Sequence, residues 1–125
     1  MSSHRVRRVE EAVLRVIGEK LITEVQLPQI ARVTVTGVDM SPDLKNAKVY
    51  FSILATSDKE KNQIFHSVIR KKKEIRYIIG RELDLRFVPE LHFELDETAE
   101  RVARIEELID QIHQDETEEE TESDG

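Results

Sequence analysis

The sequence has no cysteine and no tryptophan, and aromatic residues make up only 5% of its 125 positions. Disulfide bonds and thiolate metal ligands are therefore excluded. No apolar run approaches the roughly 18 residues that a membrane span needs. The first ten residues, MSSHRVRRVE, are charged and precede no apolar block, which is not the pattern of a secretory signal. We therefore expect a soluble, cytoplasmic protein that does not contact a membrane.

Motifs for catalysis and metal binding are also missing. There is no glycine-rich phosphate loop, no G-x-S-x-G and no H-E-x-x-H helix. The four histidines lie in four different segments without ligand-like spacing: His4, His66, His92 and His113. We therefore expect no enzyme, no catalytic residue, no metal site and no cofactor.

Charge is abundant but unevenly distributed. The chain has a formal net charge of −7 at pH 7. Residues 1–81 contain 16 Lys and Arg against 9 Asp and Glu, whereas residues 82–113 contain 3 against 10. The last twelve residues, QDETEEETESDG, hold 7 acids and no base. An asymmetry of this kind indicates interaction with nucleic acid or another anionic surface.

Apolar periodicity predicts one helix and two strands in the first part of the chain. Residues 5–23 carry apolar side chains at helical spacing. Residues 33–36 alternate Val with Thr, and residues 47–53 alternate again, so both segments are predicted strands. Gly37 is predicted to mark a bulge. The connection SPDLKNA is short, so we expect the two strands to pair antiparallel.

A long helical pattern follows at residues 58–83, and it is interrupted near its middle. The sequence SDKE at residues 57–60 fits a capping box. Lys71 and Lys72 occupy positions where the apolar stripe should continue. A single helix of this length would be about twice as long as usual. We therefore predict two helices that meet at a bend around residues 71–73.

A third strand and a last helix complete the pattern. Val88 precedes a proline, which disfavours helical backbone and ends the helical region. The next segment, ELHFELD, alternates cleanly and predicts a strand. Its core-facing residues are predicted to be Leu91, Phe93 and Leu95, with His92 and Glu94 facing outward. Asp96 or Thr98 is expected to cap the last helix. The apolar stripe of that helix consists of Val102, Ile105, Leu108, Ile109 and Ile112.

Together these elements predict an α+β fold with the order α-β-β-α-α-β-α. The second strand reaches the third through two helices, which favours parallel neighbours and a right-handed connection. The expected result is a three-stranded mixed sheet with helices on one face. Residues 1–113 are expected to form one domain. Residues 114–125 are too acidic to bury a core, so we predict a disordered tail there.

Two groups of cations are candidates for binding. The segment RKKKEIRYIIGR, residues 70–81, places six positive charges in twelve residues. Arg5, Arg8 and Arg15 share one face of the first predicted helix. Such side chains often only keep a helix soluble. Here, however, lysines replace expected apolar residues and the acids lie elsewhere in the chain. We therefore interpret both groups as a surface for phosphate contacts with nucleic acid.

Three stretches carry a family resemblance: HRVRRV near the start, DLKNAKVYFSI in the hairpin, and EIRYIIGRELDLRFVPELHFELDET. In this order they resemble the bacterial ribosome-binding factor A family, from about Arg5 to Leu108. The resemblance implies a type II KH-like domain that binds the small (30S) ribosomal subunit during late maturation and supports 16S rRNA processing. It also implies a link to the 5′-terminal helix of that RNA and to growth in the cold. The family is not a family of enzymes.

The sequence departs from the family at the bend. The family has a kink of the form Ala-x-Gly, and matching EIRYIIG places this kink on residues 71–73, which are all lysine. Backbone approach to RNA is therefore not expected here, and side-chain charge is expected to replace it. The expected RNA-binding residues are Arg5, Arg8, Arg15, Arg70, Lys71, Lys72, Lys73, Arg76 and Arg81.

Two functions remain open at this point. The first is a monomeric 30S maturation factor that reads RNA by shape and phosphates, since aromatic platforms for stacking bases are scarce. The alternative is a protein-interaction module, whose basic face docks an acidic ribosomal protein or an assembly GTPase rather than RNA.

Overall fold

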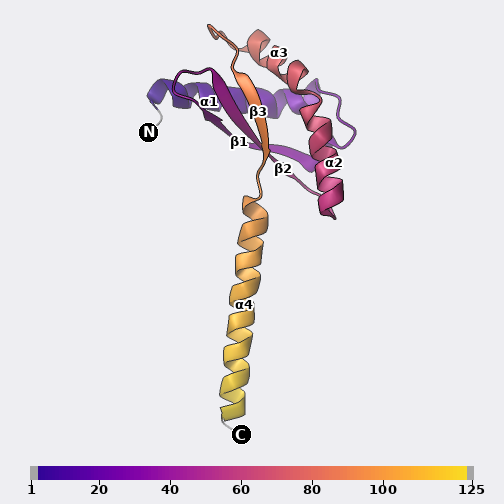
Figure 1. Cartoon of the computed structure of the whole chain (residues 1–125), viewed down its shortest axis with the longest axis vertical. Coiled ribbons are helices and arrows are strands. Elements are labelled where there is room, and N and C mark those ends of the chain that lie inside the picture. The colour runs from indigo at the N-terminus through magenta and orange to yellow at the C-terminus, as the bar shows by residue number, and fades with distance from the viewer. Residues whose placement is uncertain (1–2, 124–125) are drawn as a thin grey trace.

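A three-stranded mixed sheet forms the centre of the molecule (Figure 1). The computed structural model describes residues 3–123, with side chains as far as residue 116. The strands are β1 (Val33–Met40), β2 (Asn46–Ile53) and β3 (Glu90–Leu95). β1 pairs antiparallel with β2, and β2 pairs parallel with β3. The predicted sheet, including the parallel pair reached through two helices, is confirmed.

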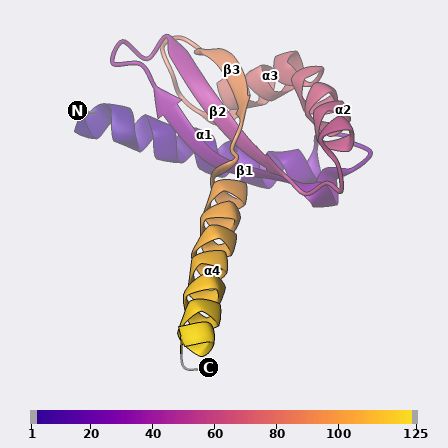
Figure 2. The same ribbon diagram turned by 60° about the horizontal axis from the view of Figure 1, so that its bottom comes forward.

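Four α-helices accompany the sheet: α1 (His4–Thr23), α2 (Asp58–Ile69), α3 (Lys72–Glu82) and α4 (Thr98–Ser123). The element order is the predicted one, with a short 3-10 turn, Ile30–Arg32, added before β1. Helices α1, α2 and α3 lie together on one face of the sheet (Figure 2). The α+β class with this topology is therefore confirmed.

The core lies between this face of the sheet and the three helices. Its most deeply buried side chains come from four elements and include Val13, Val49, Phe51, Val68 and Ile79, each 0% exposed. The predicted register of β3 is confirmed, because Leu91 is buried while His92 and Glu94 are exposed. Phe93 packs edge-on against Phe51 with ring centroids 4.9 Å apart.

A bulge interrupts β1 where glycine occurs in the sequence. The pairing register shifts between Val35 and Gly37, so Thr36 has no partner of its own on β2. The Thr36 hydroxyl donates a hydrogen bond of 2.7 Å to Asp96, just after β3. The predicted bulge is therefore present, and it connects β1 to the start of α4.

The turn between β1 and β2 contains an unusual backbone conformation. Leu44 has φ of 64°, the only positive φ of a non-glycine residue in the described part of the chain. Side chains and backbone hold the turn: the Ser41 hydroxyl donates to Asp43 at 2.6 Å, and the Leu44 amide donates to the Ser41 carbonyl at 2.9 Å. A leucine in this region is disfavoured on steric grounds, so the surrounding bonds must stabilise it.

Helix α4 extends away from the domain and does not lie on the sheet (Figures 1 and 2). The predicted apolar stripe exists but is exposed to solvent, with Val102, Ile105, Leu108, Ile109 and Ile112 between 47% and 58% exposed. The helix also continues to Ser123, with no break at residue 113, where a disordered tail was expected. Glutamate is a good helix former, which favours this continuation. The division of the chain at residue 113 stays a prediction.

Candidate nucleic-acid interface

Helix α1 presents three exposed arginines. Arg5, Arg8 and Arg15 are all exposed, whereas Val6 and Val13 on the same helix are buried. Within residues 3–116, none of the three forms an ion pair. Their guanidinium groups are therefore available to an external anion.

The bend between α2 and α3 forms without glycine. Arg70 has φ −62° and ψ −21°, and Lys71 has φ −92° and ψ 6°. Both conformations are open to ordinary L-residues, so no small residue is needed. The Lys71 amide donates to the Val68 carbonyl at 3.0 Å, three residues back, which tightens the last turn of α2. The predicted two-helix arrangement is confirmed, and the two junction residues are Arg70 and Lys71.

The start of α2 also agrees with the sequence in part. The Ser57 hydroxyl accepts a hydrogen bond of 3.2 Å from the Glu60 amide, as a capping residue does. The Glu60 carboxylate does not return to Ser57. It pairs with Arg32 and accepts a bond of 2.8 Å from Thr56. One half of the predicted capping box is therefore present.

The lysines at the bend differ in their surroundings. Lys71 lies 3.8 Å from Glu74, and the Lys72 ammonium lies 5.3 Å from the centre of the Phe93 ring. Both residues are half-buried, so their aliphatic stems cover part of the core edge where apolar residues were expected. Arg70 and Lys73 are exposed and form no ion pair within residues 3–116.

Arg76 holds the loop that follows α3. Its Nε donates to the Pro89 carbonyl at 3.1 Å, and its Nη2 donates to the Val88 carbonyl at 3.0 Å. These bonds satisfy two backbone acceptors at the entry to β3. Arg76 therefore positions the loop, a role that its sequence neighbourhood does not reveal.

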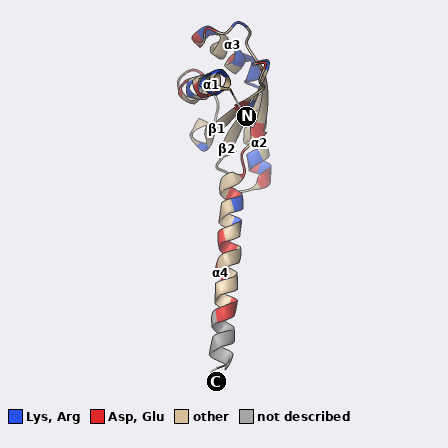
Figure 3. Ribbon diagram, turned by 90° about the vertical axis from the view of Figure 1, so that its left-hand side faces the viewer, with Lys and Arg blue, Asp and Glu red and all other residues tan. Residues whose placement is uncertain are grey.

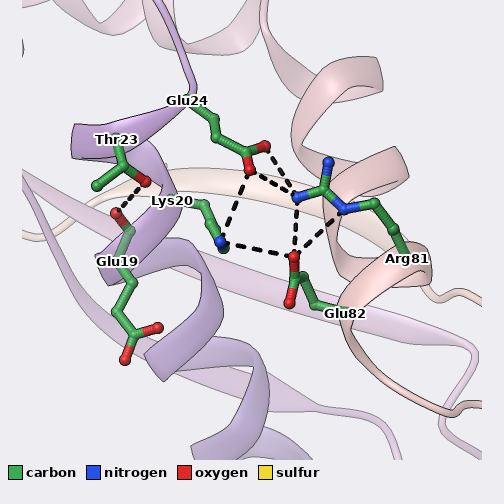
Figure 4. A network of polar contacts seen from close by, with 6 residues as sticks. All are labelled: Glu19, Lys20, Thr23, Glu24, Arg81 and Glu82. Carbon is green, nitrogen blue, oxygen red and sulfur yellow. Dashed lines mark hydrogen bonds and ion pairs between the residues drawn. The ribbon is translucent and has the colours of Figure 1, made fainter.

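Arg81 belongs to a network of ion pairs between α1 and α3 (Figure 4). Its Nη2 lies 2.8 Å from Glu24 and 2.9 Å from Glu82, and Lys20 lies 3.6 Å from each of these carboxylates. Hydrogen bonds to Glu24 and then Glu82 raise the pKa of Arg81, while the bond from Arg81 lowers the pKa of Glu82. The positive charge of Arg81 is therefore compensated within the protein.

The nine residues expected to bind RNA thus divide by their contacts. Arg76 and Arg81 hold the fold together, and Lys71 and Lys72 have intramolecular partners. The other five of these nine residues have no such partner within residues 3–116: Arg5, Arg8, Arg15, Arg70 and Lys73. Figure 3 shows both signs of charge on the domain, whereas α4 carries blue residues near its start and mainly red residues beyond.

Two exposed aromatic side chains were missed by the sequence reasoning. Tyr77 is 69% exposed on α3, and Phe87 is 64% exposed in the loop before β3. Tyr77 falls outside the apolar stripe formed by Ile75, Ile78 and Ile79, so its exposure could have been predicted from the sequence. The position of Phe87 depends on how the loop is anchored and has no such signal.

Other kinds of site find no support in the described structure. Within residues 3–116, no group of three or more His, Asp or Glu side chains is placed to hold a metal ion. In the part of the chain that the structure describes, no helix combines the length and apolar composition that a bilayer crossing requires.

Comparison with known proteins decides the family. The family model described as ribosome-binding factor A matches residues 5–109, which is most of the chain. The chain belongs to the ribosome-binding factor A family. A ribosome-binding factor A from Latilactobacillus sakei subsp. sakei is 38% identical over 115 residues, covering 90% of this chain and 96% of that protein. One from Syntrophobacter fumaroxidans is 32% identical over 117 residues, covering 93% and 100%. The family is named for binding and not for a catalytic activity.

Solved structures show the family fold. A solution NMR structure of a Thermotoga maritima protein has a TM-score of 0.65 at 24% identity, covering 75% of this chain and 89% of that one. A homology model of Thermus thermophilus ribosome-binding factor A, as fitted into a cryo-EM map of a 30S–RbfA complex, has a TM-score of 0.56 at 18% identity. The match covers 71% of this chain and 92% of that one.

Proposed function

We propose that this chain binds the 30S ribosomal subunit during its late maturation and contacts 16S rRNA through phosphate groups. The observation that carries the proposal is that five of the nine predicted RNA-binding cations are exposed and have no intramolecular partner within residues 3–116: Arg5, Arg8, Arg15, Arg70 and Lys73. A cation already paired with a carboxylate gains little from a phosphate, whereas a free one releases counterions when it binds. The five free cations lie on α1 and around the α2–α3 bend.

The relatives support the choice of partner. Proteins that are 32% and 38% identical are named as ribosome-binding factors, and the Thermus thermophilus member has been fitted into a map of its 30S complex. The proposed action is to assist 16S rRNA processing, with contacts near the 5′-terminal helix and importance during growth in the cold. The protein acts in the cytoplasm as a monomer and without catalysis.

The recognition mode follows from the type of contact. Arginine and lysine side chains bind phosphates whatever the base sequence, and folded RNA is recognised mainly by shape, phosphates and 2′-hydroxyls. The bend contains no glycine, so we expect side-chain charge to contact the RNA there in place of the Lys71 backbone. We expect affinity to come from charge and position to come from the rigid α2–α3 angle.

The test removes free cations while leaving structural ones in place. The double variant Arg70→Gln/Lys73→Gln should sediment less with immature 30S particles than the unmodified protein does. The log–log dependence of affinity on salt should fall by about 1.4 to 1.8 units, because two phosphate contacts are lost. Lys48→Gln/Lys59→Gln is the matched control, since both residues are exposed but lie on the outer sheet face and at the start of α2.

Two results would count against the proposal. Equal salt dependence of the two double variants would show that the bend is ordinary solvated surface. Binding to assembled 30S particles or to one purified ribosomal protein or GTPase, without any salt-dependent binding to 16S rRNA, would instead favour the protein-interaction module.

A further inference from the structure

A cavity of about 330 Å³ borders the cationic surface just described and shares Arg5 with it. It is open to solvent and bordered by α1, by the β1–β2 turn and by the loop of residues 83–89, and its lining includes Arg5, Leu44, Asp84 and Phe87. A second hollow of about 350 Å³ continues from it along α1 and shares Arg5 and Asp84. The first cavity reaches the size range of small-molecule sites, so it can receive a flat ring.

The loop of residues 83–89 is anchored so that one aromatic ring faces out. Pro89 is fully buried, Val88 packs against the core, and Arg76 binds both of their carbonyls. Phe87, between Arg86 and Val88, is nevertheless 64% exposed. An anchored loop that leaves a large apolar ring in water provides a ready stacking platform. The Arg86 guanidinium already lies 5.5 Å from the centre of this ring.

The opposite wall is formed by the strained β1–β2 turn. Leu44 holds a positive φ of 64° that glycine or asparagine would adopt more easily, and its side chain lines the cavity and packs on the core. Asp43 beside it is fixed through Oδ1 by the Ser41 hydroxyl and the Lys45 amide, at 2.6 and 3.0 Å. These bonds, with the Ser41 hydroxyl as the main cause, lower the pKa of Asp43. The carboxylate is therefore ionised at neutral pH.

The charges around the ring are of two kinds. Arg5 and Arg86 are cations that line the cavity, and Asp43 and Asp84 are carboxylates that line it. Asp43 is held by Ser41 and Lys45, whereas Asp84 has no hydrogen bond or ion pair within residues 3–116. Cations suit the phosphates that flank a nucleotide, and a carboxylate accepts hydrogen bonds from an amino group on a base edge. An apolar peptide side chain would use the ring but not the free carboxylate.

We propose that this cavity binds one unpaired RNA base that carries an exocyclic amino group, stacked on Phe87 and hydrogen-bonded to Asp84. The inference rests on the proposed RNA-binding function and adds base recognition to it. It assigns α1 two roles, because Arg5 holds a phosphate beside the base while Arg8 and Arg15 contact phosphates further along. It also revises the expectation that stacking contributes little in this chain.

The experiment measures binding of the full chain to two six-nucleotide RNAs by NMR titration at low salt. One RNA contains only uridine, and the other has a single central cytidine, which carries an amino group where uridine has the 4-carbonyl and an acceptor N3 where uridine has an N3–H. We expect the cytidine RNA to bind about fivefold more tightly. Its amide shifts should centre on residues 43–44 and 84–87.

Three variants separate the parts of the site. Phe87→Ala should weaken binding of the cytidine RNA by about tenfold without changing its salt dependence, because stacking involves no counterion release. Asp84→Ala, which removes both acceptor oxygens, should abolish the preference for cytidine. Tyr77→Ala removes the other exposed ring, which lies outside the cavity. It should change neither the affinity for the cytidine RNA nor the preference for cytidine. Because Phe87 is exposed, Phe87→Ala should remain folded, and Phe87→Tyr should retain binding.

The outcomes distinguish this inference from the proposed function. If the protein binds neither RNA nor 30S particles, the proposed function fails. Binding to 30S particles with no response to either short RNA, or equal binding of both RNAs, would overturn the base site alone. If Phe87→Ala and Tyr77→Ala weaken binding of the cytidine RNA equally, the base site is also overturned, because the stacking is then non-specific. A loss of 30S binding in Phe87→Ala with unchanged RNA binding would assign the cavity to a protein side chain.

Discussion

Gly18 and Gly80 both lie inside helices, but their neighbours differ. A Cβ atom added at Gly18 would lie 3.7 Å from Val35, an ordinary contact. A Cβ added at Gly80 would lie 2.9 Å from Cγ2 of Val88, which is too close. Gly80 therefore lets α3 approach the loop that carries Phe87, whereas Gly18 costs helix stability without a packing reason.

The two alanine variants should change stability in opposite directions. Gly18→Ala should raise the melting temperature, because alanine is favoured over glycine in a helix by about 1 kcal/mol, or about 4–8 °C for a small domain. Gly80→Ala should lower it, because overpacking of about 1–3 kcal/mol exceeds that gain. The double variant Gly80→Ala/Val88→Ala should recover part of the loss. If Gly80→Ala is more stable than the unmodified protein, the Val88 side chain can move away from the added methyl group at little cost.

Asp96 offers a second prediction at the level of single residues. The Thr98 hydroxyl and then the Thr36 hydroxyl lower the pKa of its carboxyl group. A lowered pKa in the folded state stabilises the protein above roughly pH 4, and this stabilisation is lost as the pH falls through the folded-state pKa. Thr36→Val should therefore raise the pKa of Asp96, measured by carboxyl carbon NMR, and Thr36→Ser should keep it low. An unchanged value in Thr36→Val would mean that the bulge does not orient this hydroxyl in solution.

At the scale of elements, α2 and α4 are connected by an ion pair that contains one buried charge. Lys61 is only 8% exposed and pairs with Glu100, whose side chain is 43% exposed. Glu100→Gln should destabilise the protein by about 1–3 kcal/mol, because the buried Lys61 ammonium loses its charged partner. The loss stays in this range because water reaches the partly exposed side chain at position 100.

The control removes both charges. Lys61→Met/Glu100→Gln should be close to the unmodified protein in chemical denaturation, since methionine keeps the volume and needs no partner. If Lys61→Met/Glu100→Gln is as unstable as Glu100→Gln, the packing of Lys61 matters more than its charge.

The end of α4 is expected to contribute little to the domain. All side chains described between residues 101 and 116 are exposed, so they bury no apolar surface against the sheet. A chain that ends at residue 114 should keep its melting temperature and its near-ultraviolet spectrum, while losing helical signal in the far ultraviolet. A fall of several degrees would mean that the last residues stabilise the domain.

How much the sequence reveals also differs between elements. The faces of β3 were predictable because alternation in ELHFELD leaves one register that buries Leu91. The bend was predictable because lysines interrupt an apolar stripe. The amphipathic pattern of α4 shows which side is apolar but does not show whether anything covers it. The structural roles of Arg76 and Arg81 depend on carbonyls and carboxylates far along the chain, and like charges in a run do not distinguish them.

At the scale of the whole molecule, the charge is distributed unevenly between the domain and the projecting helix α4. Residues 1–81 hold the excess of Lys and Arg, and the acids are concentrated from residue 82 onward. Because α4 leaves the domain at the end of β3, the acids along α4 lie away from the cations of α1 and of the α2–α3 bend (Figure 3). Near a polyanion such as RNA, the domain is attracted and α4 is repelled, so the approach should be oriented.

The projecting helix also sets how the molecule moves through solvent. Its 26 residues span about 39 Å at about 1.5 Å per residue. A compact domain of the remaining size has a radius of gyration of only about 12–13 Å. The protein should therefore experience more friction than a sphere of 14.5 kDa and elute early from a gel-filtration column. Its rotation should be slower about axes across the helix than about the helix itself, which makes amide relaxation rates depend on bond direction.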